Sequence, residues 1–518
     1  MSPNINPNIN PNINPNMNKG FNDPSRELTE KDNRSGLMVI LLAVSVFLLW
    51  EMGIFGGMNF GFTLAYFAVF AVSTVYLLPA RKGDAFTWLC GILSLCFSAV
   101  FTVNSSGFVK FFSFVALVIL FLFYVGGISD ALLFDTATFR SSINLFYLPF
   151  FLTFMGVPGV FRLIFAKPKR DSGEDKGSGI SFSQIILGLL IALPVLCIMV
   201  PLLSDSDAAF SALAGRMFKN AGEYVGALIL TAIFAPFLMG MVYKLKKHDH
   251  SEQKKYSVSG RGHISVSLLA GFLGALSVIY LMYLFSQLAY ISGGFLGLLP
   301  KDYSFADYAR QGFFQMCAAT VINLIIIAIC VMLCRKKANN DIPLAVKLFA
   351  GFFCIFDLFL VASAMSKMVM YISEYGLTQK RVYVTLFMMM LGVVFICIGL
   401  RMIFRRFRYV AVIILLCSLI GLVSSLANVD RVIAEYNIEA YETGKLESLD
   451  LYALGKLSDG AIPAIYEFYT TTDNEELREQ AEDILRSRVS RTGSFENELR
   501  EYNYSVSRAK ESLEKFGK

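Results

Sequence analysis

The 518-residue chain has few charged residues, very few histidines and none of several common enzyme motifs. Charged residues make up 17% of it, against about 25% in ordinary soluble proteins. Its three histidines lie within one short segment, 248–263, which disfavours acid–base catalysis by histidine elsewhere in the chain. No GxxxxGK(S/T), HExxH or GxSxG occurs. These absences exclude the usual nucleotide-binding loop, the zinc-protease helix and the nucleophile elbow.

Paired cysteines are missing as well. All nine cysteines lie in apolar runs, and no CxxC pair occurs, which is typical of small apolar residues in membrane helices rather than of a metal site. The hydrophilic region 428–518 has no cysteine and hence no disulfide. His248 and His250 flank an Asp in a lysine-rich segment that would repel a cation. We therefore expect no metal, no cofactor and no nucleic-acid partner.

Long apolar runs dominate what is present. Apolar residues make up 55% of the chain, 47 residues are Phe, and the mean hydropathy is +0.56. A helix of about 20 apolar residues crosses a bilayer and satisfies its own backbone hydrogen bonds there. The sequence therefore predicts an all-α, polytopic transmembrane helix bundle in two groups, 37–128 and 183–427. Its eleven spans are expected at about 37–53, 59–79, 85–103, 108–128, 183–203, 222–243, 264–290, 312–334, 344–366, 382–404 and 408–427.

The distribution of Lys and Arg predicts which side of the membrane each connecting segment faces. With eleven spans and a cytoplasmic N-terminus, the inner segments hold 25 of these residues and the outer loops between spans hold 8. The run 143–166 is apolar enough to span, but a span there would move the basic residues that follow it to the outside. We therefore interpret 129–182 as a cytoplasmic segment in which 143–166 forms an interfacial or re-entrant helix. A bacterial plasma membrane is expected, with the C-terminus extracytoplasmic.

Hydrophilic regions flank the spans at both ends. Residues 1–36 begin with an Asn/Pro repeat, which disfavours helix, and we expect a disordered cytoplasmic tail without a signal peptide. Residues 428–518 have a net charge of −7 and apolar residues at helical spacing. We expect a small helical extracytoplasmic module in which Pro463 opens one helix, Asp473 caps the next, and the last twenty residues fray.

Asp357 is the most informative polar residue, because it lies near the middle of a predicted span. A charged side chain at that depth costs about 2.5–3.5 kcal/mol on insertion scales. Asn323 lies at a similar depth in the preceding span and is a candidate hydrogen-bond partner. Two interpretations remain open: proton or cation coupling in a transporter, or a neutral, hydrogen-bonded Asp that fastens two helices.

The segment between the seventh and eighth spans contains a second set of candidates. Asp302, Asp307 and Arg310 lie among aromatic residues in a predicted outer segment. Asp307 and Arg310 are three residues apart, so they are spaced to pair on a helix. The segment is interpreted either as an extracytoplasmic binding surface or as an interfacial anchor.

A further outer segment follows the ninth span. Gly376 is suited to end one helix and Thr378 to cap the next. Arg381 then lies outside, against the general charge bias, and Glu374 is its candidate counter-charge.

Four segments resemble the signature segments of a bacterial multi-span family. They are ADYARQGFF from Ala306, YISEYGLTQKRV from Tyr371, NVDRVIAEYNI from Asn428 and LDLYALGKLSDGAIP from Leu449. The family is catalogued as domain of unknown function 4173, with 4153 as a relative, and the resemblance covers roughly residues 180–465. It implies a polytopic membrane protein, found largely in bacteria, and supplies no reaction or catalytic residue.

Three functions are compatible with these features. The first is a non-enzymatic cell-envelope protein that senses a signal or binds an extracytoplasmic protein partner through its C-terminal tail. The second is a secondary transporter that uses Asp357. The third is an intramembrane enzyme that acts on lipid-linked material at the outer face through Asp302, Asp307 and Arg310. The lipid bilayer is the one partner that all three share.

Overall fold

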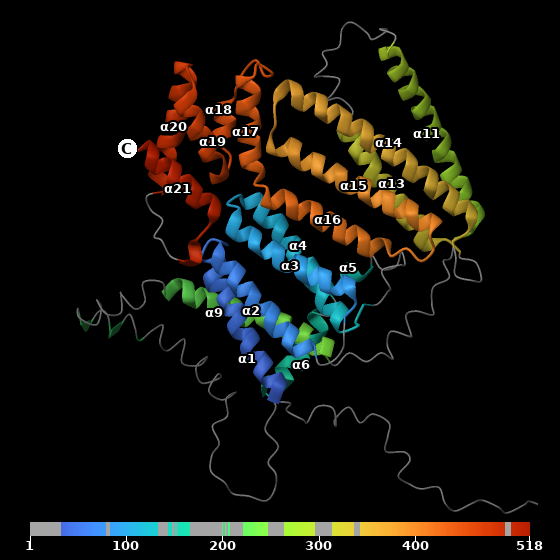
Figure 1. Ribbon diagram of the computed structural model, residues 1–518. Helices are drawn as coiled ribbons and strands as arrows, with labels where there is room; N and C mark the ends of the chain where they lie inside the picture. Colours follow the sequence, from blue (N-terminus) through green and yellow to red (C-terminus); the bar gives the residue numbers. More distant parts are fainter. Residues whose placement is uncertain are drawn as a thin grey trace, which may run out of the picture.

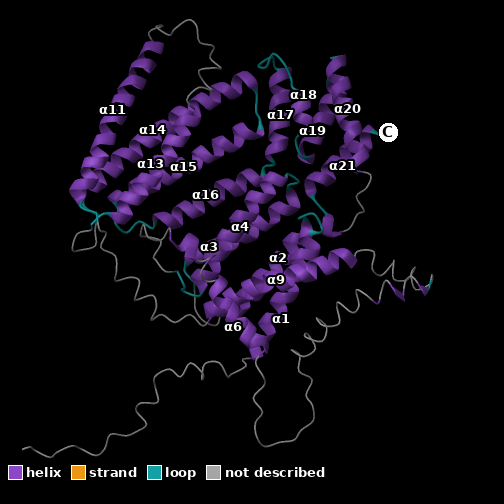
Figure 2. Ribbon diagram, turned by 180° about the vertical axis from the view of Figure 1, so that it is seen from behind, coloured by secondary structure: helices purple, strands orange, loops and turns teal. Residues whose placement is uncertain are grey.

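The chain folds into helices that are arranged as a membrane bundle with a smaller helical module at one end (Figures 1 and 2). The computed structural model describes residues 33–78, 83–132, 143–147, 150, 153–165, 199, 202–203, 206–207, 221–246, 264–295, 313–335, 342–492 and 499–517. The all-α prediction is confirmed. Within these ranges there is no β-strand, and the backbone forms one isolated β-bridge, between Ile264 and Cys334.

Ten of the described helices are long and apolar enough to cross a membrane, and they match ten of the eleven expected spans. The remaining expected span, 183–203, lies outside the described residues except for a few positions near its end, and it stays a prediction. The long helices are α1 (Asn33–Leu48, continued by the π-helix η1, Leu49–Ile54), α2 (Phe60–Leu77), α3 (Ala85–Val103), α4 (Gly107–Ile128), α9 (Ala221–Lys246), α11 (Val266–Phe295), α13 (Phe313–Leu333), α14 (Leu344–Tyr375), α15 (Gln379–Ile403) and α16 (Tyr409–Leu426).

The long helices pack around two separate apolar cores. One core joins α1 to α4 with α9, and the other joins α11, α13, α14 and α15 with the first residues of α16. α16 lies between the two groups and packs on both α15 and α3. The sequence grouped 222–243 with the spans that follow it, whereas α9 packs with the spans that precede it.

The short helix α6 (Thr153–Phe165) packs beside α9 in the first group. It follows α5 (Asn144–Phe146) and packs along the second half of α9, where Phe154 lies 5.3 Å from Phe237 between ring centroids. Gly156 and Gly240 lie so close that a Cβ atom on either would overlap the other helix. Small residues allow membrane helices to approach in this way. α6 has 13 residues and is too short to cross a bilayer, which needs about 20.

The long helices end on two opposite faces of the bundle. On the first, which we call the module face, Lys110 at the start of α4 donates to the carbonyl of Gly57, 3.2 Å away. On the second face, Arg408 before α16 pairs with Asp84 before α3 at 2.7 Å, and Gly83 lies near Ile128 at the end of α4. α4 therefore ends on the second face. α9 begins on the module face, where Glu223 in its first turn contacts the C-terminal module.

The C-terminal module is a compact group of short helices around its own apolar core. It is formed by α17 (Val429–Glu442), α18 (Leu451–Gly455), η4 (Asp459–Ala461), α19 (Ile462–Thr471), α20 (Glu475–Thr492), η5 (Leu499–Glu501) and α21 (Tyr504–Phe516). Pro463 lies in the first turn of α19, as expected.

Two expectations about the module were wrong. The cap of α20 is Asn474, whose side chain accepts from the backbone N–H groups of Glu476 and Leu477, and not Asp473. The last residues form α21 rather than a frayed end, because Leu513 and its neighbour on the same helix face, Ala509, are buried in the core of the module.

Candidate functional site

Asp357 lies at the centre of a polar chain that links three membrane helices. Its Oδ1 accepts a hydrogen bond from the Asn323 amide at 2.7 Å. The Asn323 carbonyl oxygen in turn accepts one from the Tyr280 hydroxyl at 2.5 Å. Asp357 and Asn323 are both 0% exposed. The structure therefore brings together the predicted pair and adds Tyr280 of α11 to it.

The position of Asp357 follows from the buried face of α14. Phe353, Cys354, Leu360 and Val361, which are three or four residues away from it, are all buried and mark the face that packs against α13 and α15. The sequence could not show which face of α14 is buried, because apolar residues occur on every side of the helix.

Within the described part of the chain, only one of the two carboxylate oxygens of Asp357 is hydrogen-bonded. Its Oδ2 is buried and makes no hydrogen bond within the part of the chain that the structure describes. A hydrogen bond between membrane helices stabilises by about 0.6 kcal/mol on average and about 1.7 at most, whereas an ionised carboxylate at mid-depth costs about 2.5–3.5 kcal/mol. The bond from Asn323 therefore offsets only part of the cost of a charge, and Oδ2 is left for a proton or a cation.

Arg381 closes the turn between α14 and α15. Its guanidinium donates to the carbonyls of Tyr375 and Gly376 and lies 4.2 Å from the centre of the Tyr371 ring. The expected roles of Gly376 and Thr378 are confirmed: Gly376 ends α14 with φ +71°, and the Thr378 side chain caps α15.

Glu374 does not act as the counter-charge that the sequence suggested. It is exposed, and within the described residues the guanidinium of Arg381 is bound by carbonyl oxygens instead. An arginine at the end of a helix satisfies carbonyls that have no partner within the helix. Arg381 therefore has a structural explanation.

The remaining predicted candidates, Asp302, Asp307 and Arg310, lie outside the described residues. Among the described residues, no three His, Cys, Asp or Glu side chains gather closely enough to hold a metal ion. The three histidines also lie outside these ranges.

An ion-pair cluster lies at the module face, and no sequence pattern predicted it. Arg500, which precedes α21, pairs with Glu51 of η1 at 2.8 Å and with Glu223 of α9 at 3.5 Å. The side chains of Arg500 and Glu51 are only 13% and 12% exposed. Glu51 and Glu223 lie near the ends of their spans, and nothing in the sequence showed that a residue 449 and 277 positions away, respectively, would pair with them.

Asn503 extends the same attachment. Its side chain caps α21 by accepting from Val506, and its amide donates to the carbonyls of Phe101 and Asn104 at 3.0 Å each. Ser505 donates to the carbonyl of Val103 at 2.6 Å. The module therefore donates hydrogen bonds to backbone carbonyls at the end of α3. These carbonyls have no N–H donor within their own helix.

The module also contacts the second helix group. The Asn437 side chain of α17 accepts from the N–H of Leu377 at 2.7 Å and donates to its carbonyl at 2.8 Å. Gln379 donates to Asp430 at 2.6 Å. Because Arg500 binds the first group and Asn437 the second, the module bridges both groups at the module face.

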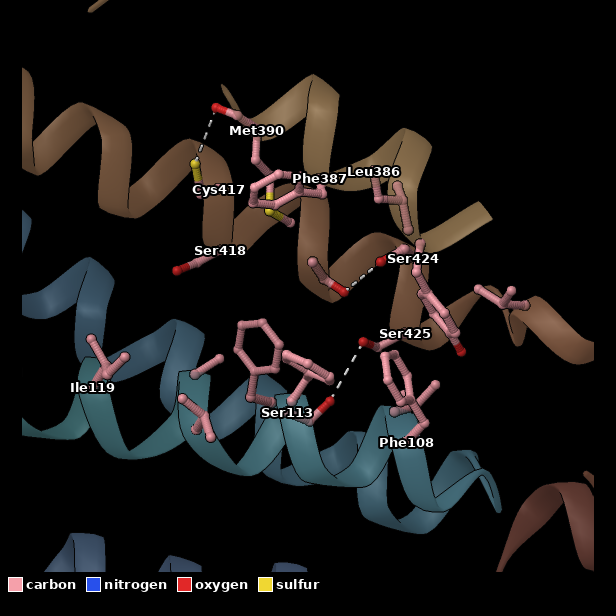
Figure 3. A pocket seen from close by; sticks show the side chains of 18 of the residues that line it. Phe108, Ser113, Ile119, Leu386, Phe387, Met390, Cys417, Ser418, Ser424 and Ser425 are labelled. Carbon is pink, nitrogen blue, oxygen red and sulfur yellow. Dashed lines mark hydrogen bonds between the residues drawn. The ribbon is translucent and has the colours of Figure 1, made fainter. Parts of the chain in front are cut away.

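An apolar groove lies between α4, α15 and α16 (Figure 3). Its volume is about 610 Å³. Phe108, Tyr383 and Ser425 line the end towards the module face, and Ile119 and Met390 line the deeper end. The few polar atoms along it belong mostly to serines, such as Ser424, which donates to the carbonyl of Gly421 in its own helix at 2.9 Å.

Comparison with known proteins supports the family assignment in its broader form. The family model described as domain of unknown function (DUF4153) matches residues 65–468. The match begins well before the segments that suggested the resemblance, and it concerns the relative rather than 4173, which stays a prediction. Comparisons with curated proteins and with solved structures gave no match. A model that covers most of the chain identifies its family, and this multi-pass membrane protein belongs to the DUF4153 family.

Proposed function

We propose that the chain is a non-enzymatic protein of the bacterial cell envelope, in which the C-terminal module binds an extracytoplasmic protein partner and passes the effect to the membrane helices. The observation behind this proposal is the attachment of the module to both helix groups, through Arg500 on one side and Asn437 on the other. A partner that shifts the module would act on both groups at once, as coupling between sites requires.

The proposed orientation rests on charge. The second face has Arg401, Arg405, Arg406 and Arg408 beside the start of α16, and basic residues favour the cytoplasmic side. The module, with its net charge of −7, would then lie outside the cell.

The exposed surface of the module offers a place for a partner. Tyr452 on α18 is 73% exposed, and the Lys456 ammonium lies 4.0 Å from the centre of its ring. Aromatic side chains are enriched among the residues that dominate binding energy at protein interfaces. We therefore expect Tyr452 to contact the partner.

Complementation of a strain that lacks the gene tests this proposal. Tyr452→Ala should fail to restore the phenotype of the intact gene while the protein stays at normal levels in the membrane. Val75→Ala, which changes an equally exposed apolar residue of α2, is the matched control and should complement. Full complementation by Tyr452→Ala would contradict a partner surface there.

A second candidate function, secondary transport, is favoured by Asp357, whose buried Oδ2 has no hydrogen-bond partner among the residues that the structure describes. In proteoliposomes with a pH-sensitive dye inside, an imposed membrane potential would drive proton entry through the intact protein. Asp357→Asn keeps the shape and the acceptor for Asn323 but removes the titratable group, so it should abolish this flux. Equal flux in the two proteins would exclude coupling through Asp357. In the complementation assay, failure of Asp357→Asn alone would favour transport over partner binding.

A further inference from the structure

The groove between α4, α15 and α16 extends over about one leaflet of a bilayer. On α4 it reaches from Phe108 to Ile119, and on α16 from Ile413 to Ser425. At 1.5 Å per residue these stretches are about 17 and 18 Å long. The hydrocarbon core of a bilayer is about 30 Å thick, so one leaflet contributes about 15 Å. The groove therefore begins near the module face. It ends at the middle of α4, and on the shorter α16 it continues to Ile413, about one turn from the second face.

The groove opens in a region where the surrounding solvent is lipid. Its lining is almost entirely apolar, from Phe97 of α3, through Phe112 of α4 and Phe387 of α15, to Cys417 of α16. Figure 3 shows these walls as two layers of helix with Phe108 towards one end and Ile119 at the other. An acyl chain fits such a lining, because it has no polar groups to satisfy there.

A basic residue lies beside the mouth of the groove. Lys380 precedes Tyr383 and Val384 by three and four residues, so it lies on the same face of α15, one turn nearer the module face. Side chains at the start of a helix lean towards its N-terminus, which here is the level of the lipid headgroups. Lys380 is exposed and forms no ion pair with any described residue.

We propose that this groove binds one acyl chain of an anionic phospholipid from the leaflet on the module side, with Lys380 close to the phosphate. The length of the groove is close to the thickness of one leaflet, and the lining suits a hydrocarbon chain. The exposed Lys380, one turn beyond Tyr383, supplies a cation for the phosphate, while the Asp430 carboxylate at the same end is buried and accepts from Gln379. A membrane-crossing helix of this chain, such as the expected span 183–203, needs about twice that length.

Native mass spectrometry of the full chain, purified in mild detergent and supplied with phosphatidylglycerol or phosphatidylcholine, tests the proposal. One phospholipid should stay bound to each chain, with about a fivefold preference for phosphatidylglycerol, since one basic residue contributes about 1 kcal/mol towards anionic lipid. Lys380→Gln should remove this preference without abolishing binding.

Filling the groove should remove the lipid. A Cβ on Gly421 would meet Met390 and Phe97 at an ordinary 3.7 Å, so Gly421→Leu projects into the groove without a backbone clash, and it should lower lipid retention at least tenfold. Gly351→Leu on α14, where a Cβ meets nothing within 4 Å, makes the same change elsewhere and should retain lipid. Ala116→Leu fills the groove from α4 and replaces Gly421→Leu if thermal unfolding shows that variant to be misfolded.

Two results would overturn the proposal. The first is equal lipid retention by the intact chain and by a folded groove-filling variant. The second is a disulfide between Cys417 and Cys197 on mild oxidation in membranes, which would mean that the chain itself occupies the groove.

Discussion

Removal of Arg500 should detach the end of the C-terminal module from the bundle. Arg500→Ala leaves the Glu51 carboxylate, 12% exposed in the intact protein, without its cation. Loss of one partner from a buried pair costs about 3–5 kcal/mol, whereas a surface pair contributes about 0–1 kcal/mol. Because the side chains of Arg500 and Glu51 are both nearly buried, we expect the substitution to cost about 3 kcal/mol.

Hydrogen exchange of the α21 amides in detergent measures this cost. A loss of 3 kcal/mol corresponds to exchange that is about 150-fold faster, and the apolar cores of the membrane helices should keep their protection. The double variant with Glu51→Gln should show a coupling energy of about 2 kcal/mol, within the range for residues in direct contact.

Arg508→Ala is the matched control. Arg508 lies on α21 itself, is 53% exposed and pairs with Glu511 within the same helix, so its loss should change α21 exchange by less than about 0.5 kcal/mol. The reasoning would be refuted if Arg500→Ala accelerated exchange no more than Arg508→Ala, because the module would then be held by its apolar contacts alone.

Three further predictions concern the bundle. Gly156→Ala should lower the unfolding temperature in detergent and loosen α6 from α9, since its Cβ would overlap the backbone of Gly240; unchanged stability would contradict the close approach. Gly376→Ala should cost more than about 1 kcal/mol, because φ is +71° and a Cβ would press on Asn437, and an equal Tm would contradict it. Burial raises the pKa of Asp84, but the hydrogen bonds from Thr87 and Arg408 together lower it by more. The net effect is a pKa below the ordinary value. The ionised Asp84 therefore stabilises the fold above about pH 4, and this stabilisation is lost as the pH falls through the pKa of the folded state. Unfolding measured against pH should show this loss of stability in the intact protein and not in Asp84→Asn.

The sequence predicted the spans well, because length and apolar content determine whether a helix crosses a bilayer. It also predicted the Asp357–Asn323 pair, because polar groups at mid-depth have few possible partners. It did not predict Tyr280, because a tyrosine in an apolar run looks like any other aromatic residue.

The sequence did not show which helices are neighbours. In lipid, apolar residues surround each helix, so no apolar stripe marks the packed face, and the approach of Gly156 to Gly240 depends on small residues that occur in many spans. The module attachment was missed for a related reason. Arg500 looked like one charge among many in a hydrophilic tail, and its pairing with Glu51 depends on a fold that brings together the two ends of the chain.

Labelling from the two sides of the membrane tests the account most directly. Tyr452→Cys places a thiol on the module and Arg405→Cys places one on the second face, both at exposed positions. With a membrane-impermeant maleimide, intact cells should label the first, and the second should react only after the membrane is opened. Labelling of Arg405→Cys alone in intact cells would show that the orientation is the opposite of the one proposed. Labelling of both variants would contradict a bundle whose two faces lie on opposite sides of a bilayer.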